Sequence, residues 1–180
     1  MTREAYTYRI VRLKETYFNK NPNLINMLDP NKPQKQNRRT YLYLDFQKDY
    51  YHYLVPLRSN LNHKNGFPVP SKQRPNAGLD YSHTLVIKNK DYIERAVIPT
   101  EQYQQIKSNI APIYRKTSQY ITNYMKNYMQ GKALDIPRYQ HSTLINYVSY
   151  LEKGWSKKLD YENKQRMTIK DLENKTYRRR

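Results

Sequence analysis

Two short runs of basic and polar residues have the types and spacing that phosphodiester chemistry needs. The first run follows an expected strand and consists of Arg58, Ser59, Asn60, Asn62, His63 and Lys64. Backbone amides and short polar side chains at a strand end can hold a phosphate. Because His63 shares this loop with Ser59, it is the best placed histidine for proton transfer. A loop that leaves a hairpin and is rich in turn-forming residues would have the same composition. The spacing alone therefore leaves both the phosphate site and the plain loop open.

The second run is Arg38-Arg39, directly before a strand that is expected to begin at Tyr41. An arginine guanidinium is a planar donor fork that matches the oxygens of a phosphate. A solvated basic pair at the end of a loop would have the same sequence, and for this pair taken alone the solvated interpretation is preferred.

No metal or cofactor site is expected from the residue types. The chain has no cysteine, and its histidines do not fall at metal-ligand spacing: His52, His63, His83 and His141. We expect His52 to be a packed or surface histidine, and His83 and His141 are assigned no role. RNA cleavage would then use the substrate's own 2′-hydroxyl, which attacks the adjacent phosphate and leaves a 2′,3′-cyclic phosphate and a 5′-hydroxyl.

The elements that must position these residues are predicted to form an α+β fold. Alternating polar and apolar residues predict strands at 5–13, 41–46, 50–57, 84–88 and 92–98, with hairpins at 41–57 and 84–98. Residues 19–40 and 58–83 read as loops, the first with one helical turn at 24–28. The sheet is expected to be compact, twisted and antiparallel, or closed into a barrel.

Flanking helices are expected mainly in the C-terminal half, at 100–107, from Pro112 to Gly131, and from Ser142 to Gly154. Apolar and aromatic residues recur at helical spacing in the long second helix, which predicts one buried stripe. We expect one domain over residues 1–154. Residues 155–180 carry nine Lys and Arg residues and are expected to form a basic C-terminal helix or tail.

The composition indicates a polyanionic partner. The 180 residues include 33 Lys and Arg against 15 Asp and Glu, a formal net charge of +18, together with 20 tyrosines. Basic surface with exposed aromatic rings is typical of proteins that hold single-stranded nucleic acid. The alternative is that the tyrosines form the core and the lysines keep the chain soluble. No apolar run is long enough to span a membrane and no signal-peptide run is visible, so we expect a cytoplasmic protein with no membrane partner.

Four short motifs give the order of these pieces a more specific meaning. They are YLVPLRS at 53–59, NHKNG at 62–66, GLDYS at 78–82 followed by TLVI at 84–87, and SQYI at 118–121. In this order, over about residues 5–153, the chain resembles the ToxN/AbiQ family of type III toxin–antitoxin endoribonucleases, most closely its abortive-infection members. The basic segment after Gly154 lies outside the resemblance.

The resemblance implies a Kid/MazF-like fold and cleavage of mRNA or phage RNA without metal or cofactor. It also implies inhibition by a repeated, pseudoknotted antitoxin RNA, which the toxin processes, and assembly of protein and RNA into an oligomer. The family's residues at the scissile phosphate correspond to Arg58 and Ser59, its basic residue at the preceding strand corresponds to Arg39, and its groove aromatic corresponds to Tyr120. With the candidates above, this gives as catalytic residues Ser59, Arg39, Arg58 and His63, and as RNA-binding residues Arg38, Tyr41, Lys64 and Tyr120.

The chain departs from the family pattern at two positions. Arg58 stands where the family has a hydroxyl residue, and Leu61 stands where a lysine is sometimes found, a role that Lys64 or His63 could take. The rival hypothesis is a non-catalytic, basic RNA-binding protein of ribosomal type, which composition alone does not separate from the enzyme. A membrane-surface protein is disfavoured because no amphipathic anchor is present.

Overall fold

The computed structural model describes residues 6–46 and 51–153. The chain divides into two compact units, Met1–Tyr147 and Val148–Arg180. Of the second unit, residues 148–153 are described and are helical. The basic segment 155–180 that the sequence singles out lies outside the described residues, so its role stays a prediction. Everything below concerns the first unit.

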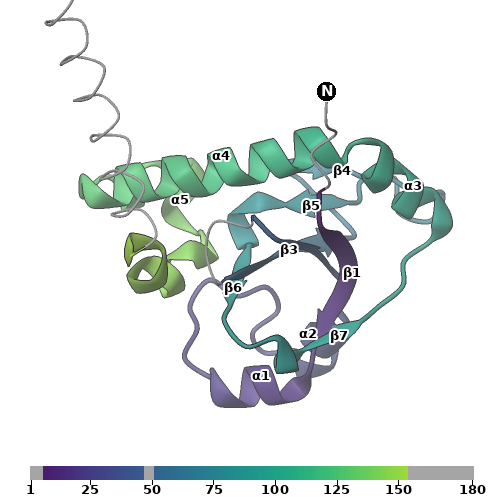
Figure 1. Ribbon diagram of the computed structural model, residues 1–180, viewed down its shortest axis with the longest axis horizontal. Helices are drawn as coiled ribbons and strands as arrows, with labels where there is room; N and C mark the ends of the chain where they lie inside the picture. The colour runs from purple at the N-terminus through teal and green to yellow at the C-terminus, as the bar shows by residue number, and fades with distance from the viewer. Residues whose placement is uncertain (1–5, 47–50, 154–180) are drawn as a thin grey trace, which may run out of the picture. The chain divides into compact units, whose positions relative to one another are not determined.

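The first unit is an α+β fold built on a seven-stranded antiparallel sheet, as expected (Figure 1). The strands are β1 (Tyr8–Leu13), β2 (Tyr41–Leu44), β3 (His52–Arg58), β4 (Gly66–Pro68), β5 (Gly78–Asp80), β6 (Leu85–Ile87) and β7 (Ile93–Arg95). Their order is β4-β5-β3-β2-β1-β7, and β6 also pairs with β3. Among the described strands the sheet is open, with β4 and β7 at its two ends.

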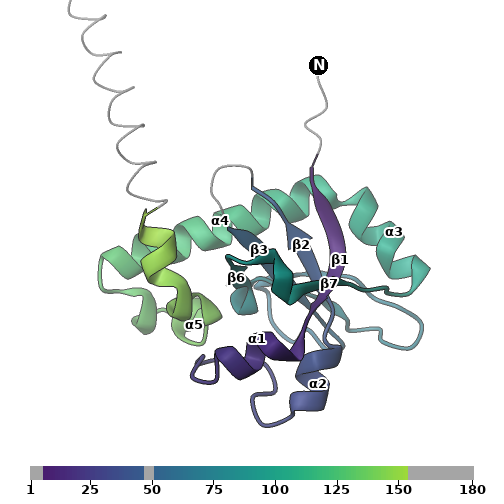
Figure 2. The ribbon, with the colours of Figure 1, turned by 60° about the horizontal axis from the view of Figure 1, so that its bottom comes forward.

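Helices cover the sheet from two sides. α1 (Glu15–Lys20) and α2 (Pro33–Arg38) lie on one side, and α3 (Thr100–Ser108) and α4 (Ile110–Met129) lie on the other (Figures 1 and 2). All four residues of β2 are buried as a consequence. On the α4 side, the ring of Phe46 contacts both Tyr53 of β3 and Tyr114 of α4, with ring centroids 4.8 and 4.4 Å apart.

The long helix α4 follows the sequence prediction closely. Its buried residues are Ile113, Thr117, Tyr120, Ile121, Tyr124 and Met125, which are six of the seven residues predicted from the helical period; the seventh, Tyr128, is half-buried. Gly131 ends the helix with φ +70°, where the N–H of Lys132 donates to the carbonyl of Asn127 at 2.9 Å. A glycine is favoured there because this left-handed conformation is strained for residues with a Cβ. The short helix α5 (Pro137–Gln140) and the 3₁₀ turns η3 (Ala133–Asp135) and η4 (Thr143–Tyr147) follow.

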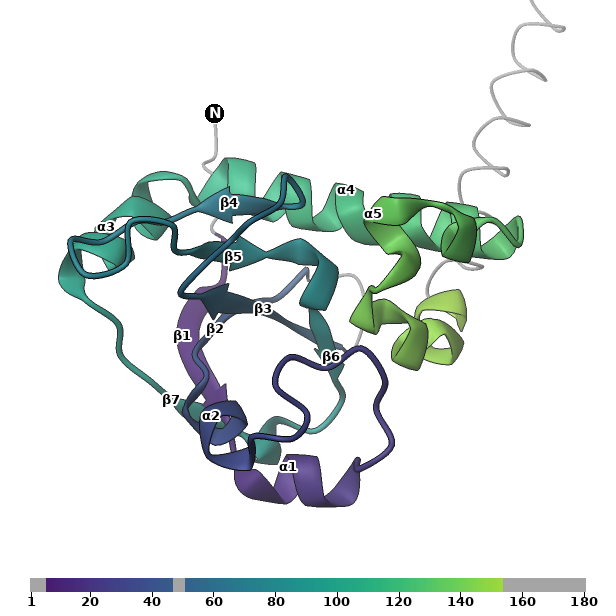
Figure 3. The ribbon, with the colours of Figure 1, turned by 180° about the vertical axis from the view of Figure 1, so that it is seen from behind.

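Three local predictions are wrong. The segment 58–83 is not one loop: it contains β4 and β5, which Figure 3 labels, and the whole of the 3₁₀ turn η1 (Tyr81–His83). Residues 84–98 do not form a hairpin, because β6 pairs with β3 and β7 pairs with β1, with the 3₁₀ turn η2 (Lys90–Tyr92) between them. Residues 19–40 contain α2, and residues 24–28 form turns in place of a helical turn.

Two glycines allow β4 and β5 to pack closely against the end of β3. A Cβ on Gly78 would lie 2.5 Å from the side chain of Leu61 and 2.7 Å from the carbonyl oxygen of Phe67, and one on Gly66 would meet the backbone carbonyl of Leu79. Neither backbone oxygen can move aside without disturbing the sheet. Gly78 also lies opposite Arg58 in the register of β5 and β3, which leaves room above the strand for the arginine side chain.

Within the described ranges, no helix has the length and apolar character that crossing a bilayer requires.

Candidate active site

A buried carboxylate at the end of β5 gathers five donor groups. Asp80 is 0% exposed, and its Oδ1 accepts hydrogen bonds from the Ser82 backbone N–H at 3.0 Å and from the Ser82 hydroxyl at 2.5 Å. Its Oδ2 lies 2.9 Å from Arg58 Nη1, 2.8 Å from His83 Nδ1 and 3.2 Å from His63 Nε2. We call these residues, Asp80, Arg58, His63, Ser82 and His83, the Asp80 cluster.

Local sequence explains how Ser82 and His83 reach the carboxylate. Asp80 is the residue before η1, and its side chain caps that 3₁₀ turn through the Ser82 N–H. Aspartate is favoured at such a position because its short side chain can accept from the backbone two residues on. The tight turn then returns His83, three residues after Asp80, to the same carboxylate.

Arg58 and His63 arrive from a different part of the chain. Arg58 is the last residue of β3 and pairs with Gly78 of β5, so Asp80 is its diagonal neighbour on the same face. His63 comes from the connection between β3 and β4, and its Nδ1 accepts from the Asn65 N–H at 3.2 Å. The sheet register and this loop therefore bring together residues that span 58 to 83.

The hydrogen-bond pattern assigns a different proton arrangement to each histidine. Because His63 Nδ1 accepts from Asn65, the proton of the neutral ring is on Nε2 and is donated to Asp80. His83 presents Nδ1 to the carboxylate, which places the proton of its neutral ring there, while the Ser82 hydroxyl donates to Asp80. Within the described chain, His83 Nε2 makes no hydrogen bond, so it keeps a lone pair that can accept a proton.

The cluster keeps Asp80 ionised. Burial opposes the charged carboxylate, but the hydrogen bonds from His83, Ser82 and Arg58 hold the pKa of Asp80 well below its usual range. The side chains of Arg58, His63 and His83 are 25%, 28% and 16% exposed, so solvent and a ligand can reach the donors around a carboxylate that is itself sealed. A buried aspartate that orients a partly exposed histidine is an arrangement suited to general base catalysis.

A basic cavity of about 250 Å³ adjoins the cluster. It shares Lys64, Asn65 and Tyr81 with the loop and turn that carry His63 and Asp80. We call it the cation cavity, and its full lining is Lys64, Asn65, Gly66, Tyr81, Lys116, Gln119, Tyr120, Asn123 and Arg138. The lining contains no carboxylate.

The three cations of this cavity have no acidic partner. Lys64, Lys116 and Arg138 are exposed and form no ion pair within the residues that the structure describes. The Arg138 guanidinium lies 5.8 Å from the ring centroid of Tyr120, which helps to fix its position. Three unpaired cations around one hollow form a site for an anion such as phosphate.

Two tyrosines, Tyr81 and Tyr120, line the inner wall of the cation cavity. The hydroxyl of Tyr120 donates to the carbonyl of Arg138 at 2.7 Å, and the ring is only 3% exposed. Burial raises the pKa of Tyr120, and the charge of Asp80 raises it further. The hydroxyl of Tyr81 is buried and has no hydrogen-bond partner among the described residues, although burial of an unpaired hydroxyl is costly.

The structure brings some of the predicted site residues together and separates others. Arg58 and His63 both contact Asp80, and Lys64 lines the adjoining cavity. Ser59 follows Arg58 in the chain and is exposed, and neither its contacts nor the lining of the cavity places its hydroxyl against the described residues of the cluster. Tyr120 lines the cavity from within the core.

The residues predicted near the start of β2 lie in a different environment. Arg39 is held by an ion pair with Asp29, its side chain is 9% exposed, and its Nε has no partner within the described residues. Tyr41 is 3% exposed, and burial raises its pKa. Arg38 is exposed. The start of β2 does lie beside the end of β3, since Leu57 N–H donates to the Thr40 carbonyl at 2.9 Å, but the Arg39 guanidinium is directed to Asp29.

Sequence reasoning missed three members of the Asp80 cluster. Asp80 and Ser82 entered only as letters of the GLDYS motif, and His83 was assigned no role. The available signal was the spacing Asp-x-Ser-His, in which an aspartate that caps a tight turn precedes a histidine by three residues. We expected His52 to be either packed or on the surface, and it is packed. It is buried, and its Nδ1 lies 2.9 Å from the Tyr43 hydroxyl.

This chain matches no family model, no curated protein and no solved structure.

Proposed function

We propose that this protein is an endoribonuclease that needs no metal ion and cleaves RNA through the substrate's own 2′-hydroxyl. The observation that carries the proposal is the Asp80–His83 pair beside a cavity with three unpaired cations. Such a pair supplies a proton acceptor of fixed orientation, and the cations supply charge for a phosphate. These are the two requirements of this reaction.

The chemical step is assigned as follows. His83 Nε2 takes the proton of the 2′-hydroxyl while the 2′-oxygen attacks the adjacent phosphorus, and the bond from phosphorus to the 5′-oxygen breaks. A proton passes to the leaving 5′-oxygen, which yields a 2′,3′-cyclic phosphate and a 5′-hydroxyl. Asp80 keeps the His83 proton on Nδ1 and stabilises the imidazolium that forms. His83 is favoured over His63 as the base because both nitrogens of His63 are engaged.

Negative charge that develops on the phosphorane needs nearby donors. Arg58 is tied to Asp80 through Nη1 and keeps further N–H donors, since a guanidinium carries five. Lys64 and Lys116 offer charge from the cavity side. His63 is assigned the proton transfer to the leaving oxygen: a solvent proton first converts its ring to the imidazolium, the Asn65 N–H moves away, and the new N–H on Nδ1 is donated to the 5′-oxygen.

Ser59 is proposed to donate a hydrogen bond to the scissile phosphate, because its exposed hydroxyl follows Arg58 directly and the family resemblance places a serine there. Ser59→Ala should lower the cleavage rate by about 100-fold, the effect of losing one donor at a developing oxyanion. The fold and RNA affinity should stay close to wild type. Equal cleavage by the variant would show that Ser59 is a surface residue only.

The biological setting is proposed from the resemblance together with the excess charge. The protein would be a cytoplasmic toxin of a type III toxin–antitoxin and phage-defence system, restrained in an RNA–protein oligomer by a repeated antitoxin RNA that it processes. A relation of the helix-covered sheet to the Kid/MazF barrel belongs to the same proposal. A tandem array of short repeats directly upstream of the coding region is the expected genomic signature, and its absence would count against this setting.

A non-catalytic RNA-binding protein is the second candidate, because the Asp80 cluster also has a structural effect. The carboxylate ties β5 to the end of β3 through Arg58 and holds η1 through Ser82. A structural role of this kind would need neither an unused Nε2 on His83 nor an adjacent cavity, which is why the enzyme is preferred.

The purified protein incubated with RNA in excess EDTA separates the two candidates. We expect cleavage, with products whose 3′ ends resist phosphatase until the cyclic phosphate is opened. A matched RNA with a 2′-O-methyl group at the cleaved nucleotide should stay intact. Dependence on a divalent cation, or products with 5′-phosphate ends, would overturn the mechanism, and binding without cleavage would favour the second candidate.

A further inference from the structure

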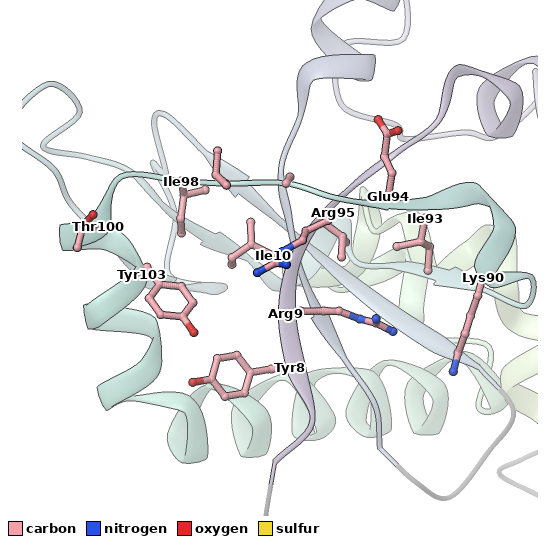
Figure 4. A pocket seen from close by; sticks show the side chains of 13 residues that line it. Tyr8, Arg9, Ile10, Lys90, Ile93, Glu94, Arg95, Ile98, Thr100 and Tyr103 are labelled. Carbon is pink, nitrogen blue, oxygen red and sulfur yellow. The ribbon is translucent and has the colours of Figure 1, made fainter.

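A second and larger cavity lies at the other end of the sheet. Its volume is about 670 Å³, and it is formed by β1, β7, the residues that follow β7 and the start of α3 (Figure 4). We call it the β1–β7 groove. The Asp80 cluster is on β3 and β5, while the groove is on β1 and β7, so β2 separates the two sites in the sheet.

The groove exists because β7 is shorter than β1. The two strands pair only from Val11 to Leu13, after which the Ala96 N–H donates to the Ile10 carbonyl at 3.1 Å. The chain then turns away toward α3. Tyr8 and Arg9 therefore have β2 on one side and, within the described chain, no strand on the other. The resulting gap beside the first residues of β1 is the groove.

One part of the groove carries unpaired positive charge. Arg9, Lys90 and Arg95 line it and form no ion pair within residues 6–46 and 51–153. Its only lining carboxylate, Glu94, is engaged by Arg12 at 2.5 Å. Arg9 is held in place, because its guanidinium lies 4.4 Å from the ring centroid of Tyr43. The Arg9 guanidinium is therefore held in position for an anion before any ligand binds.

Another part of the groove is aromatic and aliphatic. Figure 4 shows the rings of Tyr8 and Tyr103 close to each other, with Ile98 and Ile10 beside them and Arg9 and Lys90 directed away from them. Burial raises the pKa of Tyr8, and the neighbouring Tyr103 hydroxyl adds to the shift. Tyr103 is 38% exposed, so one of its surfaces remains available for stacking.

We propose that the β1–β7 groove binds single-stranded RNA, with phosphates on Arg9, Lys90 and Arg95 and a base against Tyr8 and Tyr103. Cationic side chains beside flat, exposed aromatic rings match the alternation of phosphate and base along a single strand. An acidic peptide added as a strand fits less well, because only the first residues of β1 extend beyond its pairing with β7. Among the described residues that line the groove there is no histidine, and we assign it binding only. The proposal requires RNA binding but not the nuclease activity.

The test measures binding of a fluorescent single-stranded 2′-O-methyl oligonucleotide, which cannot react through its 2′-hydroxyl. The double variant Lys90→Glu/Arg95→Glu should weaken affinity at least tenfold and reduce the salt slope by about 1.4, as expected for two lost phosphate contacts on a single strand. The control Lys32→Glu/Lys72→Glu changes the net charge equally at exposed residues outside both cavities. Equal weakening by the two double variants would overturn the proposal, because it would indicate a diffuse charge effect.

A second variant tests the aromatic part without changing charge. Tyr103→Ala should weaken oligonucleotide binding by about fivefold, within the usual contribution of one base stacked on an aromatic ring. Binding of inorganic polyphosphate, which has no bases, should be unchanged, and the melting temperature identifies any loss of fold. Unchanged oligonucleotide affinity, or stronger competition by poly-glutamate than by unlabelled oligonucleotide, would contradict an RNA groove.

Discussion

The two ends of the sheet carry similar charge but different chemical groups. Each cavity has three cations without an acidic partner among the described residues: Lys64, Lys116 and Arg138 at one end, and Arg9, Lys90 and Arg95 at the other. Only the first end adjoins a buried carboxylate with two histidines. Cations alone attract and orient a phosphate, whereas bond cleavage also needs a group that accepts a proton. Under the proposed function, the comparison therefore separates the proposed site of reaction from the proposed site of binding.

The difference follows from how each end of the sheet is built. At the β4–β5 end, two glycines let strands approach closely, and the approach buries Asp80 completely. A buried carboxylate must be satisfied by donors, and those donors include both histidines. At the β1–β7 end, Glu94 lies opposite Arg12 on the last strand of the sheet, where its carboxylate remains 38% exposed and is engaged by Arg12.

The largest expected effect is that of removing the proton acceptor. His83→Gln should lower cleavage by 100-fold or more, because general base catalysis contributes about 10² to 10⁴ in rate. Binding of the unreactive 2′-O-methyl oligonucleotide should change less than twofold. The matched control is His141→Gln, since His141 is exposed and distant in sequence from the cluster. If His83→Gln cleaves at the wild-type rate while His63→Gln does not, the two histidines have the reverse roles.

The next effect concerns stability and its pH dependence. Asp80→Asn should lower the free energy of unfolding by about 3 kcal/mol near neutral pH, because it leaves the charge of Arg58 partly buried without its partner. Since the folded-state pKa of Asp80 is lowered, its contribution is present above the unfolded value of about 4 and is lost as the pH falls below it. The difference between wild type and variant should therefore shrink in acid.

Urea denaturation of both proteins from pH 7 to pH 3 measures this difference. As a control, Glu94→Gln at the other end of the sheet removes an ion pair whose partners are both well exposed. It should cost less than about 1 kcal/mol, as exposed ion pairs usually do. A similar cost for the two substitutions would contradict the contrast between a buried and an exposed carboxylate.

How far the sequence could predict this molecule depends on whether the signal is local. The period of α4 and the glycine after it are local, so six of the seven residues predicted for its stripe are buried, and Tyr128 near the end of the helix is half-buried. The hairpin of β2 and β3 was also predicted, since neighbouring strands with a short connection usually pair. Strands β4 and β5 were missed because each has three residues inside a segment rich in proline and glycine.

The site shows the same limit. Arg58 and His63 were proposed from their types and neighbours, and both reach the cluster. Asp80 and His83 were not, because their importance depends on the pairing of β5 with β3, which no local pattern indicates. The false hairpin at 84–98 has the same cause: β6 and β7 pair with strands distant in sequence, on β3 and β1.

A smaller effect distinguishes the cations of the cation cavity from those of the β1–β7 groove. Lys64→Ala/Lys116→Ala should lower kcat/KM for a dinucleotide substrate about tenfold, because both exposed lysines line the cation cavity where its single phosphate would bind. Lys90→Ala/Arg95→Ala should act mainly on long RNA, by raising its KM. The ratio of the two kcat/KM values for each variant checks this. If both variants lost kcat/KM equally on both substrates, the cations would act as one diffuse positive field and not as two separate sites.

The smallest effect tests two buried hydroxyls that lack partners among the described residues, those of Tyr81 and Tyr124. Burial raises the pKa of both, to about 12 for Tyr124, so both are neutral. Of these two, only Tyr81 lines the cation cavity.

Tyr124→Phe removes an unsatisfied group and should raise the free energy of unfolding by up to about 1 kcal/mol without affecting RNA cleavage. Tyr81→Phe should raise stability similarly and also leave the KM for a dinucleotide unchanged, because the Tyr81 hydroxyl is buried although the residue lines the cavity. Urea denaturation and dinucleotide kinetics on both variants check the pair. A raised KM for Tyr81→Phe alone would show that the hydroxyl becomes accessible to the bound phosphate, and would contradict recognition by the three charged side chains alone.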